Sequence, residues 1–206
     1  MTKIKICGIS RKQDILAVNE AMPDYIGFVF AKSRRQISDE TADELKRLLC
    51  PKILSVGVFV NENIERINSL CERGIIDLVQ LHGDETISYI LQLKDRITKP
   101  VIKAVRVSGS EVLNDSMTIP CDYLLLDTYH KEHYGGTGER FDWSVIPQMN
   151  KPYFLAGGID RDNVLDAINH QKPYCVDVSS AVETEGFKDE FKIKELVKLV
   201  RQHQQI

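Results

Sequence analysis

Short apolar runs alternate with amphipathic stretches along the whole chain. Eight runs rich in β-branched and aromatic residues begin 21 to 30 residues apart, near Lys3, Asp24, Ile53, Ile76, Pro100, Asp122, Pro152 and Pro173. Each run is nearly continuous rather than alternating, which is typical of parallel strands covered on both faces. The pattern therefore predicts eight strands of one parallel sheet.

The stretches between these runs have a helical pattern. Ser10 and Gln13, three residues apart, predict a capping box at the start of the first helix. Asn61 is predicted to cap the helix that follows the third strand. Near the C-terminus one helical face is apolar, and it consists of Ile193, Leu196, Val197 and Val200.

Eight β-then-α units at this spacing predict an α/β protein with the architecture of a (βα)8 TIM barrel. A doubly wound sheet stays open as the alternative, because periodicity alone does not separate the two. No linker or shift in composition interrupts the chain, so residues 1–206 are predicted to form one catalytic barrel domain.

Composition and charge exclude several classes of protein. The chain is 43% hydrophobic and 28% charged, with a net charge of −3 and no basic block, which argues against a nucleic acid or an anionic membrane as partner. No apolar run approaches the length of a membrane-spanning helix or a signal peptide. Five cysteines without a C-x-x-C pair argue against disulfides and a zinc ribbon. We expect a cytoplasmic protein.

Two titratable residues stand where predicted strands end, which is where barrels carry their active sites. Cys7 ends the first strand beside Gly8, and Asp127 directly follows four apolar residues of the sixth. Cys7 could be no more than a small buried side chain, and Asp127 could cap a helix or join a buried ion pair. Across a barrel mouth, however, a thiol and a carboxyl that keeps its proton near pH 7 could remove one proton and deliver another.

A phosphate site is predicted at the ends of the last two strands. Gly157 and Gly158 follow the seventh strand, and Ser179 and Ser180 follow the eighth. Barrels often bind phosphate with these two loops, where glycine lets backbone N–H groups approach and serine adds hydroxyl donors. Two ordinary turns are the alternative interpretation.

Other polar residues could also face a ligand. Arg34 and Arg35 follow the second strand and could clamp a carboxylate or belong to a solvated loop. His82 ends the fourth strand and is more typical of a structural histidine. His130 and His133 lack a regular helix that would align them, so no metal site is predicted.

Taken together, these motifs resemble the phosphoribosylanthranilate isomerase family over essentially the full length. The most specific are Lys5-Ile6-Cys7-Gly8 and the G-G-T-G-x-x-F-D-W segment, which contains Gly136 and ends at Trp143. The other motifs stand in the family's order: Gly27-Phe28-Val29-Phe30, Gly57-Val58-Phe59-Val60-Asn61, Gln80-Leu81-His82-Gly83, Leu125-Leu126-Asp127-Thr128, Ala156-Gly157-Gly158 and Val176-Asp177-Val178-Ser179-Ser180.

This resemblance implies a cofactor-independent isomerase of tryptophan biosynthesis whose substrate is a small phosphosugar. It implies that Cys7 is the general base, Asp127 the general acid, Arg35 the partner of the substrate's carboxylate, and the last two loops the phosphate site. His82 and Gly136 are further candidates for the substrate pocket. Since Arg34 precedes Arg35, the sequence leaves open which of the two reaches the substrate. It also leaves room for association with other enzymes of the pathway.

Three rival functions are weighed against this one. The histidine-pathway isomerase that performs the same type of rearrangement resembles this chain less, because that family has an aspartate where Cys7 stands. A barrel that only binds a phosphosugar is expected to lack the base or the acid. A cysteine hydrolase built on Cys7 and His82 needs an oxyanion hole that the sequence does not show.

Overall fold

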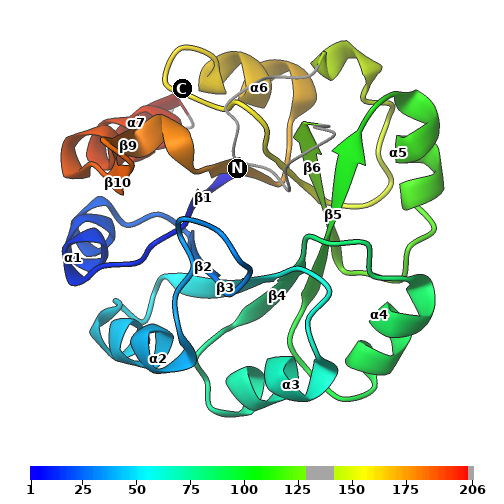
Figure 1. Ribbon diagram of the computed structural model, residues 1–206. Coiled ribbons are helices and arrows are strands. Elements are labelled where there is room, and N and C mark those ends of the chain that lie inside the picture. The colour runs from blue at the N-terminus through cyan, green and yellow to red at the C-terminus, as the bar shows by residue number, and fades with distance from the viewer. Residues whose placement is uncertain (129–141, 204–206) are drawn as a thin grey trace.

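Eight parallel strands close into a barrel in the part of the chain that the computed structural model describes, residues 1–128 and 142–203 (Figure 1). They follow one another around the barrel as β1 (Lys3–Cys7), β2 (Tyr25–Val29), β3 (Leu54–Phe59), β4 (Leu78–Leu81), β5 (Val101–Val107), β6 (Tyr123–Thr128), β7 (Tyr153–Leu155) and β8 (Cys175–Val178). Parallel pairing of β1 with β8, in which Lys5 lies opposite Asp177, closes the ring. The predicted barrel is confirmed, and the open doubly wound sheet is wrong.

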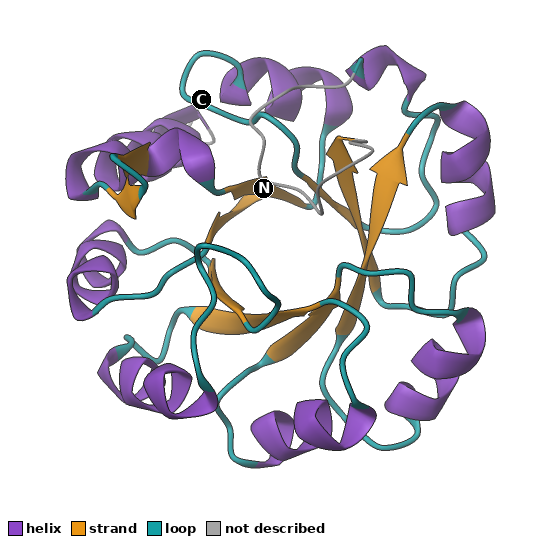
Figure 2. Cartoon of the chain, in the orientation of Figure 1, coloured by secondary structure: helices purple, strands orange, loops and turns teal. Residues whose placement is uncertain are grey.

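The helices form an outer ring around the strands (Figure 2). They are α1 (Lys12–Ala21), α2 (Asp39–Leu48), α3 (Ile64–Glu72), α4 (Ile87–Lys94), α5 (Ser110–Ser116), α6 (Val164–Gln171) and α7 (Glu190–His203). Between β6 and β7 the described residues contain only a 3-10 turn, η1 (Trp143–Val145). After β8 come a second 3-10 turn, η2 (Ser180–Val182), and a small hairpin of β9 (Glu183–Thr184) and β10 (Phe187–Lys188). None of the described helices is long and apolar enough to cross a membrane.

Alternation along each strand separates two apolar regions. Side chains that point outward pack under the helices, as Ile4, Ile6 and Val176 do. Side chains that point inward fill the barrel with a second cluster, which consists of Tyr25, Val56, Leu78, Ile102, Ala104, Leu125, Phe154, Cys175 and, after the end of β7, Ala156. Because both faces of the strands are apolar at these positions, the strands read as continuous hydrophobic runs.

The inward-facing positions change character toward the carboxyl ends of the strands. There the interior holds buried polar side chains, namely Lys5, Gln80, His82, Asp127 and Asp177. Burial of so many polar groups is unfavourable unless they pair with one another or serve a ligand. This half of the barrel is therefore where a functional site is expected.

The predicted capping box of α1 is wrong by one residue. The N-cap is Arg11 instead of Ser10, and Gln13 takes no part in the cap. Asp14 accepts the backbone N–H groups of Ser10 and Arg11, each at 3.0 Å, and its other oxygen binds the Arg11 guanidinium. The carboxylate displaces the predicted arrangement because hydrogen bonds to a charged acceptor are stronger than those to an amide.

The predicted cap of α3 also shifts. Asn63 is the N-cap and accepts the backbone N–H of Glu65 at 2.8 Å. Asn61 adopts a left-handed conformation, with φ of 49°, and accepts the N–H of Asp84 at 2.9 Å. The prediction for α7 is confirmed, because its four apolar residues are all buried.

Candidate active site

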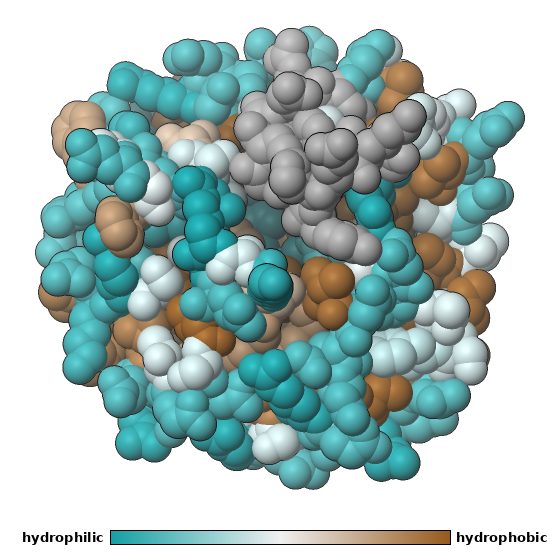
Figure 3. Space-filling model, viewed as in Figure 1, coloured by the Kyte–Doolittle hydropathy of each residue, from teal (hydrophilic) through white to brown (hydrophobic). Residues whose placement is uncertain are grey.

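A cavity of about 930 Å³ opens at the carboxyl ends of the strands. Figure 3 shows a hollow near the centre of this face, surrounded mainly by hydrophilic residues. The residues that line it include every predicted site residue in the described part of the chain: Cys7, Arg35, His82, Asp127, Gly157, Gly158, Ser179 and Ser180. Gly136, together with His130 and His133, lies outside the described residues. Barrel closure thus gathers residues at or just after the ends of β1, β2, β4, β6, β7 and β8 around one space.

Cys7 ends β1 and is partly exposed to the cavity. Its neighbour in the register with β2 is Gly27. A Cβ atom at position 27 would lie 2.6 Å from the Cys7 Sγ atom, so only glycine leaves space for the thiol there. The Ser179 hydroxyl donates to the Cys7 carbonyl at 3.2 Å, which ties the end of β1 to the end of β8.

Beneath Cys7 lies a buried ion pair between Lys5 and Asp177. The Lys5 Nζ atom is 2.8 Å from Asp177 Oδ2, and the Lys5 side chain is completely buried. Burial alone would lower the pKa of Lys5, but the nearby Asp177 and Cys7 outweigh it and raise that pKa, so the lysine is charged. Lys5 points into the barrel from the same strand as Cys7, two residues earlier.

The environment of Cys7 acts on its thiol in two directions. Burial raises the pKa of Cys7 above its ordinary value, the positive charge of Lys5 opposes this shift, and Asp177 adds to it. A cation lies where a thiolate would need one, yet in the unliganded site the neutral thiol is favoured. The positive charge of Lys5 that would lower the pKa of Cys7 is present, but burial outweighs it.

Asp127 lies near the end of β6 and faces the cavity from another side. Its Oδ1 atom accepts the backbone N–H of Thr128 at 2.9 Å. Gly157, with φ of 77°, runs directly against this strand end, and a Cβ there would lie 2.3 Å from Thr128 Oγ1 and 3.2 Å from Asp127 Oδ1. The glycine of the predicted phosphate loop therefore also makes room for the carboxyl group.

His82 contacts Asp127 from β4. The His82 Nε2 atom lies 3.2 Å from Asp127 Oδ2, although the pair does not have hydrogen-bond geometry. The other ring nitrogen, Nδ1, lies 2.8 Å from Gln80 Nε2, which points inward from the same strand. Gln80 and His82 therefore form a short chain that ends at the Asp127 carboxyl group.

Arg35 reaches the cavity from the loop after β2. Its Nε and Nη2 atoms donate to Glu183 at 2.7 and 3.1 Å. The aliphatic part of its side chain packs against Gly8, and a Cβ on Gly8 would lie 2.4 Å from Arg35 Cδ. The φ angle of Gly8 is 85°. Arg34 also contacts Glu183, at 2.7 Å, but it is more than half exposed and does not line the cavity. Of the two arginines, Arg35 is the one placed to meet a ligand.

The two loops of the predicted phosphate site lie side by side at the cavity wall. Gly157 and Gly158 both have positive φ angles, 77° and 73°, which glycine adopts without strain. The Asn163 side chain, at the start of α6, donates to the Gly158 carbonyl at 2.7 Å and holds the first loop. Lys188 donates to the Ser179 carbonyl at 2.8 Å and holds the second.

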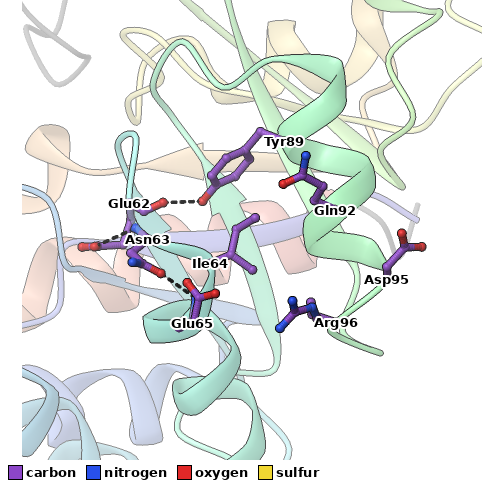
Figure 4. A pocket seen from close by; sticks show the side chains of 8 residues that line it. All are labelled: Glu62, Asn63, Ile64, Glu65, Tyr89, Gln92, Asp95 and Arg96. Carbon is purple, nitrogen blue, oxygen red and sulfur yellow. Dashed lines mark hydrogen bonds between the residues drawn. The ribbon is translucent and has the colours of Figure 1, made fainter.

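A second hollow, of about 580 Å³, lies on the outside of the barrel between α3 and α4 (Figure 4). Its wall is formed by Glu62, Asn63, Ile64, Glu65, Tyr89, Gln92, Asp95 and Arg96. The Tyr89 hydroxyl donates to the Glu62 carbonyl across it at 2.6 Å. None of the predicted site residues that the structure describes lines this hollow, so the candidate site is the cavity inside the barrel.

Five functional candidates were missed by reasoning from the sequence: Lys5, Gln80, Asp177, Glu183 and Lys188. A signal was present for three of them, because Lys5, Gln80 and Asp177 are polar residues set between apolar neighbours in strands. Glu183 and Lys188 lie in an unremarkable polar segment and carry no such signal. Among the described residues, no group of three or more His, Cys, Asp or Glu side chains is placed to hold a metal ion.

Comparison with known proteins identifies the family to which this chain is similar. Residues 4–199 match the family model of N-(5'phosphoribosyl)anthranilate (PRA) isomerase. The N-(5'-phosphoribosyl)anthranilate isomerase of Endomicrobium trichonymphae is 52% identical to this chain over 201 residues, which cover 98% of this chain and 99% of the relative. That of Lachnoclostridium phytofermentans is 47% identical, over 95% of both chains.

Solved structures agree with the sequence matches. The crystal structure of phosphoribosyl anthranilate isomerase from Thermotoga maritima has a TM-score of 0.86 and 37% identity, over 98% of this chain and 100% of that one. A phosphoribosyl anthranilate isomerase in complex with reduced 1-(o-carboxyphenylamino)-1-deoxyribulose 5-phosphate has a TM-score of 0.82 and 36% identity, with the same coverage. Fold, full-length identity and the polar end of the barrel agree, and the chain belongs to the N-(5'-phosphoribosyl)anthranilate isomerase family.

Proposed function

We propose that Cys7 and Asp127 are the general base and the general acid of this isomerase. The reaction is that of its family in tryptophan biosynthesis, the Amadori rearrangement of N-(5'-phosphoribosyl)anthranilate to 1-(2-carboxyphenylamino)-1-deoxyribulose 5-phosphate. The observation that carries the assignment is that a thiol from β1 and a carboxyl group from β6 line one cavity. An acid and a base held on different strands can reach different atoms of one bound substrate.

The chemistry needs one proton delivered and another removed. Asp127 donates a proton to the furanose ring oxygen, the bond from that oxygen to C1 breaks, and an iminium ion forms between C1 and the anthranilate nitrogen. Cys7, as the thiolate, removes the proton from C2, and the electron pair of the C–H bond neutralises the iminium to give an enolamine. Tautomerisation moves the enol proton from oxygen to C1 and gives the ketone. No atom is gained or lost.

Neighbouring groups support these roles. Lys5 supplies the positive charge that a Cys7 thiolate requires, and the reactive form of the enzyme is the fraction in which the Cys7 proton has passed to solvent before the substrate reacts. The backbone N–H of Thr128 donates to one oxygen of Asp127, His82 packs against the other, and Gly157 leaves room beside them. These contacts orient the carboxyl group, and orientation contributes to catalysis because a small displacement weakens proton transfer.

Arg35 and the last two loops are proposed to bind the two anionic ends of the substrate. The guanidinium of Arg35 faces the carboxylate of the anthranilate ring, and a guanidinium can bind a carboxylate with two parallel hydrogen bonds. Gly157, Gly158, Ser179 and Ser180 face the phosphate. The relative solved with a reduced carboxyphenylamino deoxyribulose phosphate supports a ligand with these two charged ends. A substrate contact from Gly136 stays a prediction.

The extent of the domain, the cellular compartment and the protein partners of this chain are also proposals. Cys7, near the start of the chain, and Ser180, near its end, line the same cavity, which supports one catalytic domain over residues 1–206. The five cysteines are free thiols, which supports a reducing compartment such as the cytoplasm. Association with other enzymes of the tryptophan pathway stays a prediction that co-purification would test.

The decisive experiment follows the disappearance of N-(5'-phosphoribosyl)anthranilate with the purified chain and with the variant Asp127→Asn. We expect conversion by the unaltered chain and a loss of at least about a hundredfold in kcat for the variant, the low end for a missing acid. Asp115→Asn, on the outer helix α5, is the matched control and is expected to keep full activity. A chain that binds the substrate without converting it would instead be a phosphosugar-binding barrel.

A further inference from the structure

Glu183 is a buried carboxylate that lies just outside the cavity wall, in β9. Its side chain is only 6% exposed. It accepts hydrogen bonds from three cations: Arg34 at 2.7 Å, Arg35 at 2.7 and 3.1 Å, and Lys188 at 2.8 Å. Burial favours the neutral acid, but Arg35 and Lys188 hold the pKa of Glu183 below its ordinary value, so the group is an anion at neutral pH.

The contact with Arg35 uses only one edge of the guanidinium. A guanidinium has five N–H donors in a plane and can bind one carboxylate through Nε and Nη2 and another through Nη1 and Nη2. Glu183 occupies the first edge. Nη1 donates to no acceptor within residues 1–128 and 142–203, and Arg35 lines the cavity, so its second edge is available to a ligand.

The stem of Arg35 is held as well as its head. A Cβ on Gly8 would lie 2.4 Å from Arg35 Cδ, so the side chain packs closely against the backbone after β1. One carboxylate faces three cations in this cluster, which leaves an excess of positive charge beside the cavity. Such a charge balance favours an anionic group of the substrate, and a fixed guanidinium binds it with less loss of side-chain entropy.

We propose that Glu183 is a positioning residue for substrate recognition: it holds one edge of Arg35 so that the other edge receives the carboxylate of the anthranilate ring. This inference rests on the proposed function, in which Arg35 binds that carboxylate. It assigns to Glu183 the orientation of Arg35 rather than competition with the substrate, since the two carboxylates bind different edges of the same guanidinium.

The test is the variant Glu183→Gln, which keeps the size of the side chain and removes its charge. We expect KM to rise about tenfold while kcat changes by less than about threefold, because a charge-assisted pair that orients binding is weakened. The inhibition constant of reduced 1-(o-carboxyphenylamino)-1-deoxyribulose 5-phosphate should rise by the same factor. Inorganic phosphate should inhibit as before, because Lys188 keeps its bond to the Ser179 carbonyl.

The matched control is Glu185→Gln, the same change two residues away on the exposed turn of the hairpin. It should leave KM and kcat unaltered. A fall in KM for Glu183→Gln would mean that Glu183 competes with the substrate, and an unchanged KM would mean that it does not orient Arg35. Either result overturns the proposal.

A double-mutant cycle separates positioning from a merely structural role. In the background of Arg35→Ala, Glu183→Gln should raise KM no further, since the group on which it acts is gone. Additive effects on KM would overturn the proposal. If Glu183→Gln does not fold, Arg35→Lys tests the same geometry, because one ammonium group cannot replace the two edges of a guanidinium. A normal KM for Arg35→Lys would also overturn the proposal.

The proposed function can fail separately from this inference. If the unaltered chain converts no substrate, or if Arg35→Ala leaves KM unaltered, the assignment of the reaction or of Arg35 is wrong. If both behave as expected and only Glu183→Gln is normal, the fault lies with Glu183 alone.

Discussion

At the scale of single residues, each candidate site residue of the cavity lies in contact with specific charged or polar neighbours. Cys7 shares the interior of the barrel with the Lys5–Asp177 ion pair, so its protonation depends on two opposite charges. Asp127 lies between a backbone N–H and the ring of His82. Arg35 is shared between Glu183 and the cavity. Each of these arrangements predicts the effect of a substitution.

Removal of the proposed base should stop turnover without unfolding the chain. For Cys7→Ser we expect kcat to fall at least about a hundredfold with little change in binding of the reduced product analogue, because serine fits the space but its hydroxyl ionises far less readily than a thiol. Steady-state kinetics and an inhibition constant test this. Cys50→Ser, at a partly buried cysteine far from the cavity lining, is the control. Near-normal kcat in Cys7→Ser would show that another group takes the proton.

The kcat/KM value should rise with pH along the acid limb of its pH profile. Because burial raises the pKa of Cys7, the thiol is protonated at neutral pH, and kcat/KM should increase toward alkaline pH. Lys5→Met removes the charge that lowers the pKa of Cys7 and should move this limb to higher pH. Asp177→Asn removes a charge that raises it and should move the limb lower.

Alkylation of Cys7 by iodoacetamide, followed by peptide mass spectrometry across pH, measures the same shifts without substrate, because the thiolate is the reactive form. Shifts in the same direction for Lys5→Met and Asp177→Asn would show that the ion pair does not tune the thiol through its charges.

The two arginines after β2 should differ in their effects. Arg35→Ala removes a ligand that serves ground state and transition state alike, so KM should rise about ten- to a hundredfold with kcat nearly unchanged. Arg34→Ala should have a much smaller effect, because Arg34 is exposed, pairs with Glu183 and does not line the cavity. Saturation curves of both variants decide this. A KM effect in Arg34→Ala alone would contradict the assignment.

At the scale of elements, the site depends on how the end of one strand packs against the loop after the next. The loop after β7 passes so close to the end of β6 that only glycine fits at position 157. The hairpin of β9 and β10 carries Glu183, which pairs with Lys188 and with the two arginines of the loop after β2. The proposed acid and base lie on strands, while the groups proposed to bind anions lie on the loops that these contacts hold in place.

Gly157→Ala should therefore damage catalysis through Asp127. A Cβ at 2.3 Å from Thr128 Oγ1 forces the end of β6 to move, and we expect kcat to fall about ten- to a hundredfold. Gly74→Ala is the control, because Gly74 also has a positive φ, 69°, yet no atom lies within 4 Å of the new Cβ. Both variants should lose about 1–2 kcal/mol of stability from backbone strain, but only Gly157→Ala should lose turnover. Equal kcat values in the two variants would refute this.

At the scale of the whole molecule, closure of the barrel joins the two ends of the chain. β1 pairs with β8, and α7 packs against α1 beside them (Figure 1). The cavity therefore exists only in the folded chain, with Cys7 from one end and Ser179 and Ser180 from the other. Any ligand that binds there stabilises the fold as a unit.

Inorganic phosphate should bind the loops after β7 and β8 and stabilise the chain. At a hundred times its Kd it should add about 2.7 kcal/mol to the free energy of unfolding and should inhibit competitively. Thermal unfolding and inhibition kinetics, with chloride at equal ionic strength as the control, measure both effects. Ser180→Ala should weaken both together. A crystal soaked in phosphate with these loops empty would contradict the location.

Hydrophobic patterning was enough to predict eight parallel strands and to favour the barrel over a doubly wound sheet, and it located the residues of the proposed acid–base pair. Strands covered on both faces produce continuous apolar runs, so their order and spacing are legible without long-range information. Cys7 and Asp127 are polar residues at the ends of such runs, which is why they could be found. The helix caps at Ser10 and Asn61 were predicted less well, because nearby carboxylates and amides compete for the same N–H groups.

The groups that surround those residues were not predictable from local patterns, because they come from distant parts of the chain. Lys5 meets Asp177 across 172 positions of sequence, and Arg35 meets Glu183 across 148. Such pairs depend on the register in which the barrel closes and on the path of a loop after β8, neither of which a local pattern encodes. The same closure placed Arg35 rather than Arg34 at the cavity. Hydrophobic periodicity specifies which face of a strand is buried, whereas pairing across the barrel is specified by the whole chain.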